Sequence, residues 1–114
     1  MVLDVRLYRI RSGKREEFHT LVHDQTIPLA RSHGHLVVDF GPSAHDEDTY
    51  YLIRAFPGDE ARRAALDDLY GSEEWLRDYD ERVMGFIESY QTAVFPTSPE
   101  AVDRLLEASQ WGSL

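Results

Sequence analysis

The chain contains no cysteine, a single lysine and no long hydrophobic run. The absence of cysteine excludes disulfide frameworks, thiol catalysis, zinc knuckles and iron–sulfur clusters. No apolar stretch approaches the length of a membrane span. Twenty-one acidic residues against 12 basic ones give a net charge of −9, which repels phosphate backbones and anionic lipid. We therefore expect a cytoplasmic protein that binds neither nucleic acid nor membranes.

The 114 residues fit one domain, and a hydrophobic share of 42% is enough to build a core without metal or disulfide staples. Apolar residues alternate in some segments and recur at helical spacing in others. Pro28 interrupts the first helical segment and predicts a kink, and Gly34 is a suitable residue to end it. Expected strands cover residues 2–10, 36–41, 49–56 and 88–95, and expected helices cover residues 14–33, 59–70, 72–83 and 99–106.

The predicted order is β-α-β-β-α-β followed by a C-terminal helix. This order is typical of the ferredoxin-like α+β fold, an antiparallel sheet with helices on one face. The expected strand over residues 49–56 is apolar or aromatic on both sides. A two-sided strand needs a second cover, and the same face of another copy would supply it. We therefore predict a homodimer with facing sheets.

Several short motifs follow one another in a characteristic order. The expected first strand carries an acidic-x-Arg-x-Tyr pattern at Asp4, Arg6 and Tyr8. The further motifs are Gly13-Lys14, Phe18, Pro28-Leu29, His33-Gly34, Arg54-Ala55-Phe56, Arg62-Arg63, Leu66 and Glu74-Trp75. Their order resembles the NIPSNAP family of the dimeric α+β barrel superfamily. Where the family usually has a proline, this chain has Ser12. The resemblance covers residues 2–95 and predicts a family domain over 1–95 with a helical tail over 96–114.

The resemblance implies a homodimer of ferredoxin-like subunits, each with a pocket for a small molecule between sheet and helices. The wider superfamily includes cofactor-independent monooxygenases, haem-degrading enzymes, isomerases and dehalogenases. The haem-degrading relatives carry a histidine on the second helix, and residues 59–70 contain none. The asparagine and tryptophan usual in the antibiotic-biosynthesis type of monooxygenase fall here at Leu52 and Phe56. We therefore expect no cofactor.

Arg6, Tyr8 and Arg54 form the first candidate catalytic set. If their strand faces coincide, guanidinium groups and phenols converge in a way that suits an anionic or enolisable substrate, with arginine stabilising an oxyanion and tyrosine passing a proton. The alternative is that Asp4 and the arginines pair inside the dimer interface. Alternation along one strand does not show which side chains of two separate strands point to the same face of the sheet. Both interpretations therefore remain open.

The histidines supply a weaker candidate. In the functional interpretation, His35 is an acid–base group at the pocket mouth that Asp39 orients. In the simpler interpretation, His33 caps the end of the first helix and His35 only begins a strand. His19 and His23 have a spacing that suits a metal, but no third ligand is aimed at them, and we predict no metal site.

Tyr50, Phe56, Trp75 and Phe86 are candidates to line an apolar substrate pocket, although aromatic residues also dominate ordinary cores. Two functions remain. The first is a cofactor-independent enzyme with acid/base or oxygenase/cyclase-type chemistry on a small aromatic or polyketide-like compound. The alternative is a non-catalytic homodimeric ligand-binding or scaffold module. In such a module, the expected C-terminal helix would dock on its own domain or on a partner through an apolar face formed by Val102, Leu105 and Leu106.

Overall fold

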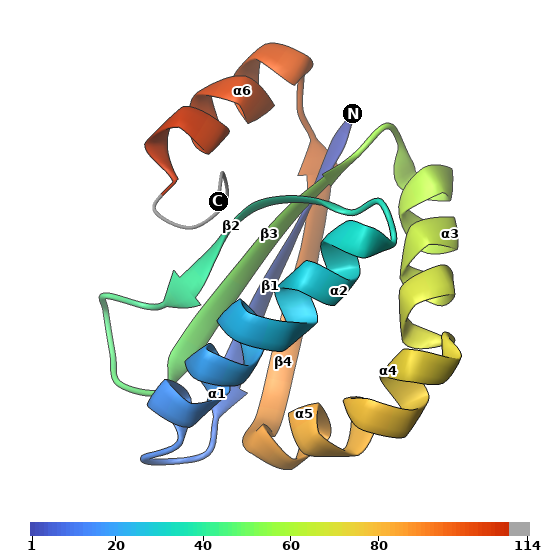
Figure 1. Ribbon diagram of the computed structural model, residues 1–114. Helices are drawn as coiled ribbons and strands as arrows, with labels where there is room; N and C mark the ends of the chain where they lie inside the picture. Colours follow the sequence, from blue (N-terminus) through green and yellow to red (C-terminus); the bar gives the residue numbers. More distant parts are fainter. Residues whose placement is uncertain (110–114) are drawn as a thin grey trace.

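The computed structural model describes residues 1–109, and these build one antiparallel sheet with helices on both sides (Figure 1). The strands are β1 (Val2–Ile10), β2 (Leu36–Pro42), β3 (Thr49–Phe56) and β4 (Ile87–Pro96), in the spatial order β2-β3-β1-β4. The helices are α1 (Arg15–Leu21), η1 (Val22–Thr26), α2 (Ile27–Ser32), α3 (Asp59–Tyr70), α4 (Glu73–Asp78), α5 (Asp80–Phe86) and α6 (Pro99–Ala108). This arrangement confirms the predicted ferredoxin-like α+β fold with an added C-terminal helix.

The first helical segment changes its winding just before Pro28, the residue at which the sequence predicts a kink. Pro28 has no N–H to donate to the preceding turn. Just before it, η1 is a π-helical turn in which the Ile27 N–H donates to the Val22 carbonyl, five residues back. Such a turn absorbs the missing bond without breaking the helix axis. Gly34 follows α2 at a φ of 83°, a left-handed conformation that glycine adopts without steric cost.

The expected helix over residues 72–83 is divided into two short helices. Ser72 caps α4 as predicted, because its Oγ accepts the Trp75 N–H at 3.2 Å. Tyr79 leaves the helical conformation between α4 and α5. On the far side of this bend, Asp80 accepts the Trp75 indole N–H at 3.2 Å. The bond ties the start of α5 to α4, so the two helices bend around the sheet together with α3 (Figure 1).

The two faces of the sheet are covered by different helices. A large core lies under α1, η1, α2 and the arc of α3 to α5. On the opposite face, α6 buries Val102 against Leu3, Val38 and Ala55. Because α6 belongs to the same chain, part of the second cover that we expected from another copy is supplied by the tail helix itself. Leu7 and Phe95, on the uncovered part of this face, remain 45% and 44% exposed.

None of the helices within residues 1–109 combines the length and apolar character that a bilayer crossing requires.

Candidate functional site

A cavity of about 200 Å³ lies between the sheet and the helices that cover its main face. Strands β1 and β3 form its floor, and α1 to α5 supply most of its walls. Apolar side chains dominate the walls, which suits a small organic compound. The aromatic residues that line the cavity are Tyr8, Phe18, Tyr50, Tyr70, Trp75 and Tyr90, and the charged ones are Arg6, Arg54 and Asp80.

The register of β1 and β3 brings the first candidate set to this cavity. Asp4 pairs with Arg54 across the two strands, and Tyr8 pairs with Tyr50. Directly paired residues point to the same face of a sheet, so all four side chains lie on the face that the helices cover, together with Arg6. Of the predicted catalytic residues, Arg6, Tyr8 and Arg54 therefore share one cavity.

Asp4 is fully buried and sits among three guanidinium groups. Its Oδ1 accepts from Arg6 Nε at 3.2 Å and lies 3.9 Å from Arg54 Nη2, and its Oδ2 accepts from Arg62 Nη1 at 2.9 Å. The partners come from β1, β3 and α3. The pairing of Asp4 with arginines is thus made within one chain and holds α3 against the sheet.

Arg54 has only 1% of its surface exposed. Its Nη1 donates to the Tyr70 hydroxyl at 2.9 Å, and its Cζ lies 5.7 Å from the centroid of the Tyr70 ring. Its Nε and Nη2 are buried and have no hydrogen-bond partner within the described part of the chain. Buried guanidinium donors without acceptors are costly, so Arg54 is an under-satisfied positive charge in the cavity wall.

The two sheet tyrosines differ in what their hydroxyls contact. Burial, assisted by Tyr70, raises the pKa of Tyr8, so this phenol stays neutral and retains a proton to donate. Burial also raises the pKa of Tyr50. The Tyr50 hydroxyl, however, is hydrogen-bonded to His19 Nδ1 at 2.6 Å. Tyr50 therefore offers the cavity its ring, and Tyr8 is the better candidate for a proton donor.

His35 and Asp39 lie apart from this set. His35 Nε2 donates to the Ala65 carbonyl at 2.9 Å, and its ring packs edge-on against Phe56. Burial lowers the pKa of this imidazole. Asp39 accepts hydrogen bonds from the Phe40 N–H and the Tyr51 hydroxyl. Neither residue lines the cavity, so the structure does not bring them together with Arg6 and Tyr8.

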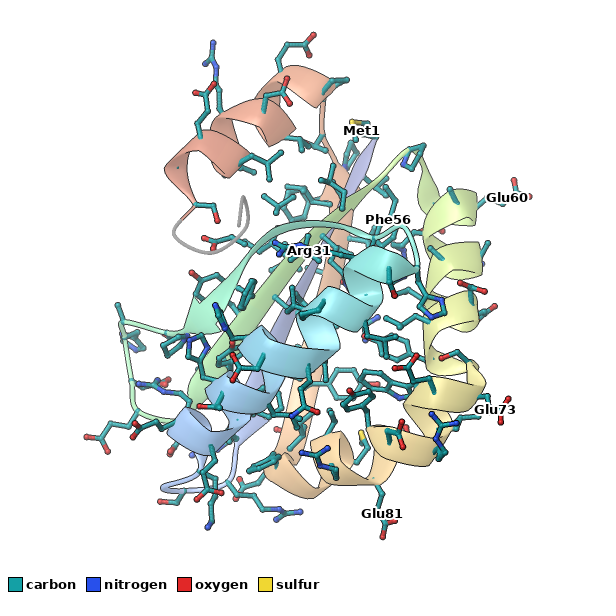
Figure 2. The ribbon with its side chains drawn as sticks, viewed as in Figure 1. Met1, Arg31, Phe56, Glu60, Glu73 and Glu81 are labelled. Carbon is teal, nitrogen blue, oxygen red and sulfur yellow. The ribbon has the colours of Figure 1, made fainter. Side chains whose placement is uncertain are left out.

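The predicted aromatic lining is only partly assembled. Tyr50 and Trp75 line the cavity. Phe56 is buried at the end of β3 that leads into α3, where Figure 2 labels it, and it is not a lining residue. Phe86 packs against the rim of the Phe18 ring, 5.7 Å between centroids, and also lies outside the lining.

His19 and His23, the pair with metal-ligand spacing, form hydrogen bonds with neighbouring side chains. His19 bonds to Tyr50, and His23 Nδ1 lies 2.8 Å from Asp24 Oδ1. Among residues 1–109 no group of three or more potential ligand side chains converges.

Sequence reasoning missed Tyr70, which bonds Arg54 and lines the cavity. Tyr70 is the last residue of α3, at the end of a segment whose helical character was predicted. Only the docking of α3 on the sheet brings it to Arg54. Asp80 was missed for the same reason, because its neighbours across the cavity are distant in sequence.

The comparisons with known proteins agree on the family and the fold. The sequence model of the NIPSNAP family matches residues 3–99. An uncharacterized NIPSNAP domain protein from Burkholderia xenovorans superimposes with a TM-score of 0.77 at 17% identity, covering 87% of this chain and 96% of that one. A NIPSNAP family protein of unknown function from Agrobacterium tumefaciens gives 0.78 at 23% identity, covering 87% and 92%.

A structure described as an antibiotic biosynthesis monooxygenase is more distant, with a TM-score of 0.63 at 16% identity, covering 87% of this chain and 100% of that one. A search of curated proteins found no match. At these identities the structural likeness shows a common fold.

Proposed function

Because this chain belongs to the NIPSNAP family, we propose that it is a homodimer that binds a small aromatic or polyketide-like compound in the cavity and transforms it without a cofactor. The observation that carries this proposal is the convergence of Arg6, Tyr8 and Tyr70 on one largely apolar cavity. An apolar cavity with a few convergent polar groups is the usual form of a small-molecule site. The cavity lies on the family's shared core, not on the tail helix.

The proposed chemistry is proton transfer next to a carbonyl or phenol, the first step of both isomerase and oxygenase/cyclase-type reactions. Tyr8 stays neutral and donates a hydrogen bond to the substrate oxygen, and the carboxylate of Asp80, which also lines the cavity, takes up the proton that leaves the neighbouring carbon. The Arg6 guanidinium stabilises the oxygen on which negative charge develops. The fold shared with an antibiotic biosynthesis monooxygenase supports this choice as an analogy of scaffold only.

The proposal of a homodimer is based on the apolar surface of the sheet that α6 does not cover. Leu7 on β1 and Phe95 on β4 are almost half exposed and lie on the same face of neighbouring strands. A large exposed apolar patch on a sheet is typical of an interface between copies. We propose that the second copy covers this patch, beside α6.

The alternative is a non-catalytic ligand-binding module. One observation favours it: Arg54 is fully buried and the Tyr50 hydroxyl is bonded to His19, so two of the candidate groups serve the packing of the domain. In that case the cavity binds its compound without transforming it.

Native mass spectrometry of the protein purified from its natural host tests the proposal. We expect a dimer with an additional mass that disappears on denaturation. Met84→Trp is expected to abolish that mass, because Met84 lines the cavity and is half exposed at its rim. The matched control is Leu76→Trp, at an exposed position that does not line the cavity. A monomer contradicts the dimer, and a mass retained in Met84→Trp contradicts the assignment of the cavity.

Catalysis is tested on the compound thus identified. Arg6→Ala is expected to abolish turnover and to leave the dimer intact. A wild-type protein that binds the compound and returns it unchanged supports the binding module instead.

A further inference from the structure

The buried charges at one end of the cavity do not balance. Arg6, Arg54 and Arg62 surround Asp4, and Arg62 is also paired with Asp59 at 2.8 Å. Three guanidinium groups therefore face two carboxylates, and Asp59 is further shared with the exposed Arg63. The cluster carries at least one positive charge in excess, inside a chain whose net charge is −9.

The excess charge is directed inward. The side chains labelled Glu60, Glu73 and Glu81 project away from the molecule along the outer surface of α3 to α5 (Figure 2). Arg63 and Arg77 are also exposed on this outer surface, whereas Arg6, Arg54 and Arg62 are at most 15% exposed and pair with Asp4. The cavity's own carboxylate, Asp80, is engaged with the Trp75 indole N–H, and Trp75 packs on Tyr70 at 4.8 Å between centroids.

Arg6 is the more accessible of the two guanidinium groups that line the cavity. Its side chain is 15% exposed, whereas that of Arg54 is 1% exposed. Its Nε is bonded to Asp4, and its Cζ lies 5.8 Å from the centroid of the Tyr90 ring. The Asp4 carboxylate and the Tyr90 ring thus fix the position of the Arg6 guanidinium group. Its two Nη groups, which carry four N–H donors, have no acceptor among residues 1–109.

Tyr70 supplies a second donor next to it. Its oxygen accepts the Arg54 Nη1 hydrogen, so its own O–H remains available to donate. A hydroxyl that accepts a hydrogen bond from a cation is a stronger donor. Arg54 also lines the cavity, but it is only 1% exposed, so it acts mainly through its contacts with Tyr70 and Asp4.

We propose, on the premise that the cavity is the small-molecule site, that its ligand carries a single planar oxyanion, a carboxylate or an enolate, on an apolar body. The oxyanion binds the Nη edge of Arg6 and the Tyr70 hydroxyl. Apolar side chains such as Phe18, Leu69 and Val83 contact the rest of the ligand. Arg54 is a positioning residue that does not touch the ligand. One negative charge balances the excess of the cluster, and its contact with a guanidinium is a charge-assisted hydrogen bond.

Benzoate and benzamide are matched probes for this oxyanion subsite. They share a planar shape and size, and an apolar cavity of about 150 Å³ is large enough for benzene. Ligand-observed NMR titration of the full chain measures both affinities. We expect benzoate to bind about 10- to 100-fold more tightly than benzamide, since a hydrogen bond to a charged group exceeds a neutral one by that order. Arg6→Gln is expected to lower benzoate affinity to the level of benzamide and to leave benzamide unchanged.

The control is Arg9→Gln. Arg9 lies on the same strand, faces the opposite side of the sheet and pairs with the exposed Glu88. This variant loses the same charge and is expected to keep the preference for benzoate. An equal loss in Arg9→Gln would mean a general charge effect and overturns the subsite.

The assay separates the subsite from the proposed function. Equal affinities of the two probes in the wild-type protein overturn the oxyanion subsite but leave the cavity as a binding site. Binding of neither probe, with no bound mass in the native spectrum, contradicts the proposed function itself. If Arg6→Gln fails to fold, intermolecular NOEs on wild-type protein decide. Contacts from benzoate to Tyr70 and Tyr90 support the subsite, and contacts confined to residues outside the cavity overturn it.

Discussion

Replacing Asp4 with asparagine removes the one carboxylate that contacts Arg6, Arg54 and Arg62 together. The asparagine has nearly the same shape, so the change is one of charge. Arg54 would remain 1% exposed with no anion beside it. Removing one partner of a buried ion pair costs about 3–5 kcal/mol, because the remaining charge stays buried and uncompensated. For a chain of this size, that loss lowers the melting temperature by about 12–20 °C.

Thermal unfolding followed by circular dichroism measures this loss. The matched control is Asp59→Asn, which removes a carboxylate from the same cluster, but one that is 44% exposed. Water solvates that position, so we expect only a small shift. A second variant, Arg54→Met combined with Asp4→Asn, removes the stranded charge and is expected to be less destabilised than the sum of the single variants. The reasoning is refuted if Asp4→Asn loses no more stability than Asp59→Asn.

Three further predictions concern the packing of α6, a buried imidazole and a left-handed glycine. Val102→Ala is expected to lower the free energy of unfolding by about 2 kcal/mol in urea denaturation, because two buried methyl groups are lost from the contact between α6 and the sheet. Leu105→Ala, at an exposed position, is expected to change this free energy little. Equal effects of the two variants would contradict the packing of α6 on the sheet. Burial lowers the pKa of His35 in the folded state, so the unfolded chain, with a histidine pKa of about 6.5, takes up the proton first and stability falls as the pH drops below that value. His35→Asn should show a shallower pH dependence of unfolding, and an unchanged slope argues against this contribution. Gly34→Ala is expected to lower the free energy of unfolding by about 1–2 kcal/mol, because φ is 83° at this position. Gly85→Ala, on a helix where a Cβ meets open space, is expected to raise it by up to about 1 kcal/mol. Thermal melts that rank the two variants the other way contradict the backbone argument.

Much of the fold follows from local pattern. Local pattern identified β1, β3 and β4 to within one or two residues. Period-two alternation indicated β1, and apolar or aromatic residues on both sides indicated β3. Pro28, Gly34 and Ser72 marked helix irregularities and ends by their own backbone chemistry. The division at Tyr79 was not predicted, because it depends on the Trp75–Asp80 bond between residues on either side of the bend.

The candidate site was predictable only by residue type. Arg6, Tyr8 and Arg54 were recognised because guanidinium groups and phenols that share a strand face suit an anionic or enolisable substrate. Tyr70 gave no comparable signal, since a tyrosine at a helix end has many roles. His35 and Asp39 do not line the cavity, and nothing in their sequence positions indicated this.

By itself, the sequence determined the element order, the family resemblance and the need for a cover on both sides of β3. These depend on residue type and on short-range periodicity, which the chain carries locally. The tertiary structure alone decided that β1 and β3 pair with Asp4 opposite Arg54, because inter-strand register is set by contacts across 50 residues. It also decided that α6 covers part of the second face and that α3 brings Tyr70 to Arg54. The charge imbalance at the cavity arises from that docking, since no segment of the chain contains it alone.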